Sequence, residues 1–479
     1  MTPLAVTITI LAYFLAMFLV SWISSKGADN NSFFTGARKS KWWVVAFAMI
    51  GSTMSGVTFV SVPGMVAANQ FGYMQMCLGF IAGYLVIAFV LTPLYFKMNV
   101  VSIYEYLDKR FGVTTHKTGA WVFFISKILG AAVRLFVVCL SLQLLVFEPL
   151  GLPFALNVLF SIAVVYAYTY KGGVKSVIWT DTLKTLCMIL AVVLSIVFIA
   201  QSLDINIFKT VSESPMSRIF HFEDGNSTNY FWKQFLGGLF TVVAMTGLDQ
   251  DMMQRTLSCK NARESQKNLI TSVFMQVVVI FLFLCLGVLL YAFAGANGIT
   301  EGGDKLFPAV ATSGLLPAVV GVFFIIGLVA AAYGAGGSAL TSLTTSFTVD
   351  IVGTKDKSEE QVAGIRKRVH IVMALLMGLV IIVFNALNSD SAITAVYRIA
   401  SYTYGPLLGL FAFGIFSKKK VFDKWVPAVA VLAPVICLVL DLNSEAWFGG
   451  YKIGFELLII NALLTVTGLC CLICRKGRG

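Results

Sequence analysis

Long apolar stretches recur along this chain, and each is close to the length of a membrane-spanning helix. A helix needs about 20 consecutive apolar residues to cross the hydrocarbon core of a bilayer. Of the 479 residues, 58% are hydrophobic and only 12% are charged, whereas a typical soluble domain carries about 25% charged residues. Backbone polar groups inside a bilayer must also pair within their own segment, which favours helices. The sequence therefore predicts an all-α polytopic membrane protein.

About 13 segments meet this criterion. We predict transmembrane helices at residues 3–23, 43–68, 73–96, 119–147, 153–170, 177–201, 232–250, 268–296, 311–348, 369–388, 392–416, 425–441 and 453–474. The ninth segment is longer than a bilayer requires, so we expect it to tilt or to project beyond the membrane.

Basic residues gather in alternate connections between these segments. One such connection carries Arg255, Lys260, Arg263 and Lys267. The positive-inside rule assigns the connections rich in lysine and arginine to the cytoplasm, so we expect the N-terminus outside and the C-terminus inside a plasma (inner) membrane. The net charge of +12 then reports topology, and it predicts no nucleic-acid partner.

A few basic residues fall inside the predicted spans. A charge at bilayer depth costs at least about 2.5 kcal/mol, so it usually faces a wet cavity or a partner group. For Lys127 and Lys184 we favour a side chain that extends to a nearby membrane interface. Arg134 and Arg398 lie deeper, and each either lines a cavity or pairs with a protein group.

Two spans are interrupted by small and polar residues. The second contains GSTMSGVTFVSVPG (51–64), and the seventh contains FLGGLFTVVAMTGLDQ (235–250). Irregular backbone at membrane depth is tolerated where it lines a cavity or is buried in protein. Two broken helices five spans apart fit two inverted repeats, spans 2–6 and spans 7–11. Close helix packing through small residues explains either stretch alone, but it explains the five-span offset less well.

Five further stretches have the pattern of a known transporter family: SIYEYLDKRFG (102–112), YKGGVKSVIWTDTLKTL (170–186), DQDMMQRTLSCKNARESQKN (249–268), LTSLTTSFTVDI (340–351) and YGPLLGLFAFGIF (404–416). In these motifs the chain resembles the sodium/solute symporter family, whose members include bacterial sodium/galactose, sodium/proline and sodium/sialic acid transporters. The resemblance covers nearly the whole chain.

The resemblance implies a five-plus-five inverted-repeat core with a broken first helix in each repeat, one extra helix before it and two after it. We expect one transmembrane transporter domain, 1–479. Its parts would be an N-terminal helix and loop (1–42), a first repeat (43–201), an outer loop with the second repeat (202–416) and two C-terminal helices (417–479).

The same resemblance implies a sodium ion between the break in the second span and the middle of the ninth. Its implied ligands are Gly51 and Met54 through their carbonyls, and Ala331, Gly334 and Ala335. Asp181 resembles an acidic residue beside the sodium pathway, and Ser338 could present a hydroxyl to it. No organic cofactor is implied.

The stretch AYGAGGSA (332–339) departs from the family pattern. Similar transporters have two adjacent hydroxyl residues where this chain has Gly334 and Ala335. Three outcomes stay open. Water or backbone replaces the hydroxyls, Asp181 alone carries the coupling to sodium or to a proton, or the coupling is lost.

The family places its solute near the membrane midplane, beside the broken second span. The residues that resemble the family's substrate ligands are Thr53, Ser55, Thr58, Tyr73, Arg134 and Arg398. An arginine suits a carboxylate because its planar fork donates two parallel hydrogen bonds. Two arginines at one cavity favour an anionic solute such as a sialic-acid-like sugar acid.

We therefore predict a secondary active transporter that imports a small polar organic solute, a sugar or an anionic sugar, with sodium by alternating access. The alternative is proton-coupled or uncoupled transport. A membrane solute sensor is less favoured, and no catalytic constellation surrounds His116, His221 or His370, so we predict no enzyme. Its partners would be the solute and the lipid bilayer, and we expect a monomer.

Overall fold

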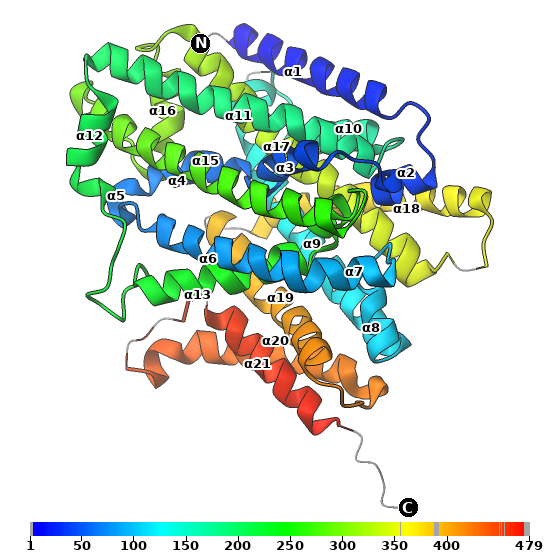
Figure 1. Ribbon diagram of the computed structural model, residues 1–479. Helices are drawn as coiled ribbons and strands as arrows, with labels where there is room; N and C mark the ends of the chain where they lie inside the picture. The colour runs from blue at the N-terminus through cyan, green and yellow to red at the C-terminus, as the bar shows by residue number, and fades with distance from the viewer. Residues whose placement is uncertain are drawn as a thin grey trace, which may run out of the picture.

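The chain forms a bundle of helices in which the long helices lie side by side. The computed structural model describes residues 3–148, 150–354, 356–387, 392–449, 451, 453–454 and 456–473. Helix α1 lies at one edge of the bundle, and α20 and α21 lie at the opposite edge (Figure 1). Within the described residues there is no β-strand, only two isolated bridges. The all-α class predicted from composition is confirmed.

The first half of the chain contains α1 (Pro3–Ser24), α2 (Asn30–Thr35), α3 (Trp42–Thr53), α4 (Gly56–Gly64), α5 (Val66–Asn69), α6 (Tyr73–Val86), α7 (Thr92–Met98), α8 (Glu105–Arg110), α9 (Val113–Leu142), α10 (Phe154–Thr169), α11 (Val174–Leu203) and α12 (Ile207–Glu213). The second half contains α13 (Phe231–Val242), α14 (Gln250–Thr256), α15 (Ala262–Ala296), α16 (Leu306–Thr312), α17 (Ala318–Ser346), α18 (Glu359–Leu387), α19 (Ala392–Phe416), α20 (Val426–Trp447) and α21 (Glu456–Cys471).

Each predicted span coincides with a helix or with a pair of helices. Among the described residues, nine helices are long and apolar enough to cross a membrane, and the bent pair of α3 and α4 makes up to ten. Helices α10 and α21 are apolar but shorter, so the count of 13 stays a prediction. The predicted span 311–348 begins later than expected, because Pro317 and a turn with Gly314 at φ +82° separate α16 from α17.

Both predicted helix interruptions are present. Helices α3 and α4 meet at an angle of 66°, because Met54 and Ser55 have extended backbone. In the second interruption, a π-helical turn (Val243–Gly247) follows α13. Asp249 then has extended backbone and caps α14. The sequence placed both breaks correctly, since glycine, serine and threonine weaken a helix at these points.

Helices α6 and α13 pack through glycines. A Cβ atom on Gly79 would collide with the carbonyl oxygen of Phe235, and one on Gly238 would collide with that of Met76. Because both neighbours are backbone atoms, neither can move aside as a flexible side chain can. These glycines let α6, which follows the first broken helix in the chain, pack closely against α13, the first half of the second broken helix.

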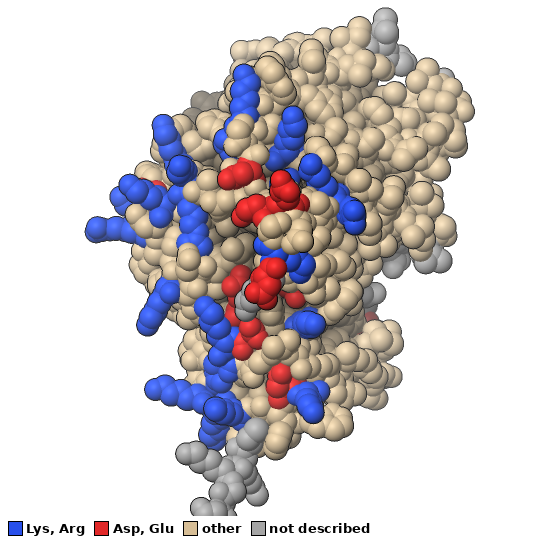
Figure 2. Space-filling view, turned by 90° about the vertical axis from the view of Figure 1, so that its right-hand side faces the viewer, with Lys and Arg blue, Asp and Glu red and all other residues tan. Residues whose placement is uncertain are grey.

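Basic side chains cover one end of the bundle. Figure 2 shows lysine and arginine gathered there, at the end where α8 lies. Lys109, Lys117 and Lys418 are exposed members of the connections predicted to be cytoplasmic.

At the same end, the Asp350 carboxylate accepts hydrogen bonds from Ser102 (2.7 Å) and Ser346 (2.6 Å) and contacts His116 (2.9 Å). This carboxylate joins the C-terminal end of the α17 segment to the segments around α8 and α9.

Candidate solute cavity and buried charge network

A cavity of about 140 Å³ lies at the break between α3 and α4. Parts of α6, α9, α13, α14, α15, α17 and α19 complete its wall. Five of the predicted substrate residues line it: Thr53, Ser55, Thr58, Tyr73 and Arg134. The structure thus brings together residues that lie up to about 80 positions apart in the sequence, and their part in binding stays a prediction.

The break itself is built by a reciprocal cap. The Ser55 hydroxyl accepts a hydrogen bond from the Thr58 amide, and the Thr58 hydroxyl accepts one from the Ser55 amide, both at 3.4 Å. These two amides are the helical i+4 partners of the carbonyls of Met54 and Gly51. The cap therefore takes away the donors that those two carbonyls would have in a continuous helix.

Arg134 projects from α9 to the cavity and is half-buried. Among the described residues it forms no ion pair with a carboxylate. Arg398 lies in α19, but its side chain is outside the described part of the structure. Tyr73 begins α6, and its ring packs edge-on against Phe80 at 6.2 Å.

A layer of charged residues forms one wall of the cavity. The Lys127 ammonium on α9 lies 3.1 Å from Asp249 and 2.7 Å from Asp251. The Tyr404 hydroxyl on α19 donates to Asp249. These contacts tie α9 and α19 to the start of α14. Lys127 therefore does not extend to the membrane interface as we predicted, because two buried carboxylates hold it inside the protein.

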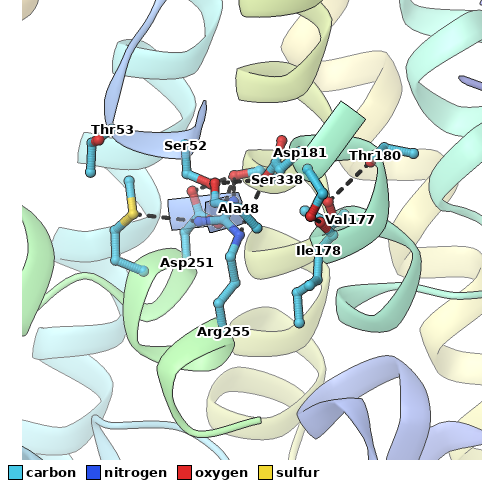
Figure 3. A network of polar contacts seen from close by, with 12 residues as sticks. Ala48, Ser52, Thr53, Val177, Ile178, Thr180, Asp181, Asp251, Arg255 and Ser338 are labelled. Atoms are coloured by element: carbon cyan, nitrogen blue, oxygen red, sulfur yellow. Dashed lines mark hydrogen bonds and ion pairs between the residues drawn. The ribbon is translucent and has the colours of Figure 1, made fainter. Parts of the chain in front are cut away.

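The charge network continues from Asp251 to Asp181 (Figure 3). The Arg255 guanidinium lies 2.9 Å from Asp251 and 3.4 Å from Asp181. Ser338 on α17 donates to Asp251 at 2.7 Å and contacts Arg255. Ser52 on α3 donates to Asp181 at 2.8 Å. Asp181 and Ser338, which we expected near a cation, are thus already engaged by an arginine.

Arg255 is only 1% exposed, although we had counted it among the basic residues of a cytoplasmic connection. The side of the membrane stays a prediction, but the side chain is not exposed in a connection, because all seven residues of the short helix α14 are buried in the protein. Asp251 and Arg255 stand four residues apart on α14 and form an ion pair. A signal was available in the sequence, since oppositely charged residues at this spacing share one face of a helix.

Lys184 on α11 lies where the resemblance implies a sodium ion. It is 0% exposed, so the predicted extension to the interface is wrong here too. A Cβ atom built on Gly334 would stand 2.6 Å from Lys184 Cδ and 3.0 Å from Lys184 Nζ, and one on Gly51 would stand 3.5 Å from Cδ. The lysine side chain therefore runs between α3 and α17, at the two glycines.

The remaining implied ion ligands lie in α17 and at the break between α3 and α4. Ala331 is fully buried in α17, Ala335 faces the cavity, and Met54 lines it at the break. Gly334 and Ala335 present no hydroxyl, and Gly334 faces the lysine and the Asp181 carboxylate. Gly334 and Ala335 thus supply no side-chain oxygen here, and the sodium ligands implied by the resemblance stay a prediction.

The profile of the sodium:solute symporter family matches residues 33–422 of this chain. The chain belongs to this family. As a member of it, the protein is a multi-pass membrane transporter, and the resemblance found in the five sequence motifs is confirmed.

Known members of the family match most of the chain. The sodium/sialic acid symporter NanT of Aliivibrio fischeri is 26% identical over 96% of this chain and 92% of its own length. The sodium/sialic acid symporter SiaT of Proteus mirabilis is 26% identical over 85% of this chain and 84% of its own. The human sodium/iodide cotransporter is 23% identical over 84% of this chain and 65% of its own.

Solved structures give the same fold. A Na⁺-coupled sialic acid symporter in a substrate-bound outward-open state has a TM-score of 0.83 and 22% identity, and the match covers 98% of this chain and 97% of that one. Mhp1, a nucleobase-cation-symport-1 family transporter, has a TM-score of 0.55 and 13% identity over 92% of each chain. The inverted-repeat transporter fold of this family member is therefore confirmed.

Proposed function

We propose that this member of the sodium:solute symporter family transports a small organic anion, with a sugar acid as the favoured class. The observation that carries the proposal is Arg134, a cation that faces the cavity without a carboxylate partner among the described residues. The other two charged residues of the cavity wall, Lys127 and Asp249, already pair with each other. An anion would therefore balance the remaining positive charge.

The polar lining of the cavity favours a hydroxylated acid. Beside Arg134, the wall presents mainly hydroxyl groups, from Ser52, Thr53, Ser55, Thr58, Ser126, Thr241 and Thr246. Hydroxyls donate and accept hydrogen bonds, as sugar hydroxyls do. Tyr73 at the start of α6 would close over the solute, and we propose Arg398 as a second cation. The names of the two bacterial relatives, both sodium/sialic acid symporters, support this class.

Transport would proceed by alternating access, with the solute held near the two helix breaks while the repeats change their tilt. We propose that 43–201 and 202–416 are these repeats and that 1–42 and 417–479 flank them. Family membership supports sodium as the driving ion and import as the direction, and coupling to a proton or to no ion is the alternative. We propose a monomer with its basic end in the cytoplasm.

The test is uptake into proteoliposomes of three labelled solutes: N-acetylneuraminate, glucuronate and galactose. We expect uptake of an acid in preference to galactose. Arg134→Ala should weaken apparent affinity for the acid by about 10- to 100-fold, since a hydrogen bond to a charged group contributes about 1.5–3 kcal/mol. Arg134→Lys should retain part of it, because lysine keeps the charge but loses the fork.

Arg263→Ala is the matched control, since Arg263 is exposed on α15. Its uptake should equal that of the unmodified protein. Preferential uptake of galactose, or full acid uptake by Arg134→Ala, would refute an anion site at this arginine.

A further inference from the structure

We infer that the Lys184 ammonium is a tethered cation that takes the place of sodium between α3 and α17. Solute binding in the adjoining cavity would then require no sodium ion at that position. This inference rests on the proposed anion transport and changes only its ion requirement.

The first argument is steric. Lys184 Cδ and Nζ lie 2.6 Å and 3.0 Å from the position of a Cβ on Gly334. Real Cβ atoms essentially never approach another heavy atom closer than 3.0 Å. A serine or threonine at 334, as in similar transporters, would therefore displace the lysine. The absence of a side chain at Gly334 leaves the space that the Lys184 side chain occupies.

The second argument comes from polar atoms without partners. Lys184 Nζ and Asp181 Oδ1 are both buried and form no hydrogen bond within the described part of the protein. The Gly334 Cβ position lies 2.9 Å from Asp181 Oδ1, so the two atoms flank the same point of α17. A buried ammonium is stabilised by nearby oxygens. The two atoms form no ion pair within 4.0 Å, so each still has room for a polar partner at this point.

The third argument is the charge balance of the buried cluster. Its carboxylates are Asp181, Asp249 and Asp251, and its cations are Lys127, Lys184 and Arg255. The charges of these six described side chains cancel. An added sodium ion would leave an uncompensated positive charge in a region of low dielectric constant, which is strongly unfavourable. Removing Lys184 would leave the cluster with one excess negative charge, which one sodium ion would neutralise.

The first experiment measures the melting temperature (Tm) of the purified protein in sodium chloride and in choline chloride at equal ionic strength. We expect the same Tm in both salts for the unmodified protein. The variant K184A/G334S/A335S should gain a sodium-specific rise of about 3 °C or more, because an ion that binds only the folded state stabilises it. A sodium-specific rise in the unmodified protein, or a triple variant without one, overturns the inference.

A mutant cycle tests the position of the lysine without any ion. Gly334→Ala should lower Tm by about 3 °C or more when Lys184 is present. In the Lys184→Ala background the same change should lower Tm by less, because the two lysine contacts are gone and only the Asp181 Oδ1 contact at 2.9 Å remains. Gly336→Ala is the matched control on α17, because its Cβ would meet Val165 at 3.2 Å and no part of Lys184. An equal loss in both backgrounds overturns the inference.

Melting temperatures measured with added solutes distinguish a failure of this inference from a failure of the proposed function. N-acetylneuraminate or glucuronate should raise the Tm of the unmodified protein equally in both salts. Stabilisation by the acid only in sodium would refute the tethered cation and leave anion transport standing. Galactose stabilisation without any acid effect would refute the anion site itself.

Discussion

At the scale of single residues, Arg255 connects two buried carboxylates of the charge network. It pairs with Asp181 on α11 and Asp251 on α14. Arg255→Met should therefore destabilise the protein by about 3–5 kcal/mol, the usual loss when one partner of a buried ion pair is removed. The free energy of unfolding is measured by denaturant titration of the protein in detergent.

Asp181→Asn added to Arg255→Met should recover part of that stability, because it removes one of the uncompensated charges. The control is Arg263→Met, since Arg263 is exposed at the start of the next helix, α15. If Arg255→Met and Arg263→Met have the same free energy of unfolding, the buried charge network does not stabilise the fold as described.

At the scale of helices, the contact between α6 and α13 depends on two glycines. Gly79→Ala should push the helices apart, because the backbone carbonyl of Phe235 occupies the space of the new methyl group. We expect a loss of about 1–3 kcal/mol, as for other overpacked sites, measured as a lower Tm. Gly295→Ala on α15 is the control, since no atom lies within 4 Å of its Cβ position; it should be neutral or stabilising.

At the scale of the whole molecule, Asp350 joins segments that belong to different predicted repeats. It accepts hydrogen bonds from Ser102 in the first and Ser346 in the second. Asp350→Asn should loosen the basic end of the bundle, since hydrogen bonds to a charged acceptor contribute about 1.5–3 kcal/mol each. Amide hydrogen exchange around α8 and the C-terminal end of α17 should accelerate by about 10-fold, with exchange in α1 unchanged. Unchanged amide exchange at α8 would show that Asp350 does not hold these segments together.

Much of the architecture followed from the sequence because the bilayer restricts it so strongly. Segment length predicted the spans, and glycine with hydroxyl residues predicted the breaks at Met54 and Leu248. The walls of the cavity were also predicted in part, since a broken helix at membrane depth indicates a binding region. Thr53 and Arg134 both line this cavity, and their part in solute binding stays a prediction.

The buried network was not predicted, and the reason is geometric. A position within a span indicates the depth of a charge but not the helix face that carries it. Lys184 could equally have faced lipid on α11, and only the approach of α17 at Gly334 places it in the core. Arg255 was missed because a helix of seven residues, α14, is too short to give a clear periodic pattern.

The lysine at the centre of the molecule also bears on energy supply. A charge that is bonded to the chain stays behind when the solute crosses. It therefore contributes none of the roughly 2.3 kcal/mol that a free cation releases on moving through 100 mV. Work against a solute gradient would then have to draw on a counter-moving anion or on an ion bound elsewhere. An anionic solute carries its own charge across, so a negative interior would oppose its entry by the same amount, and net flux would depend on both the membrane voltage and the solute gradient.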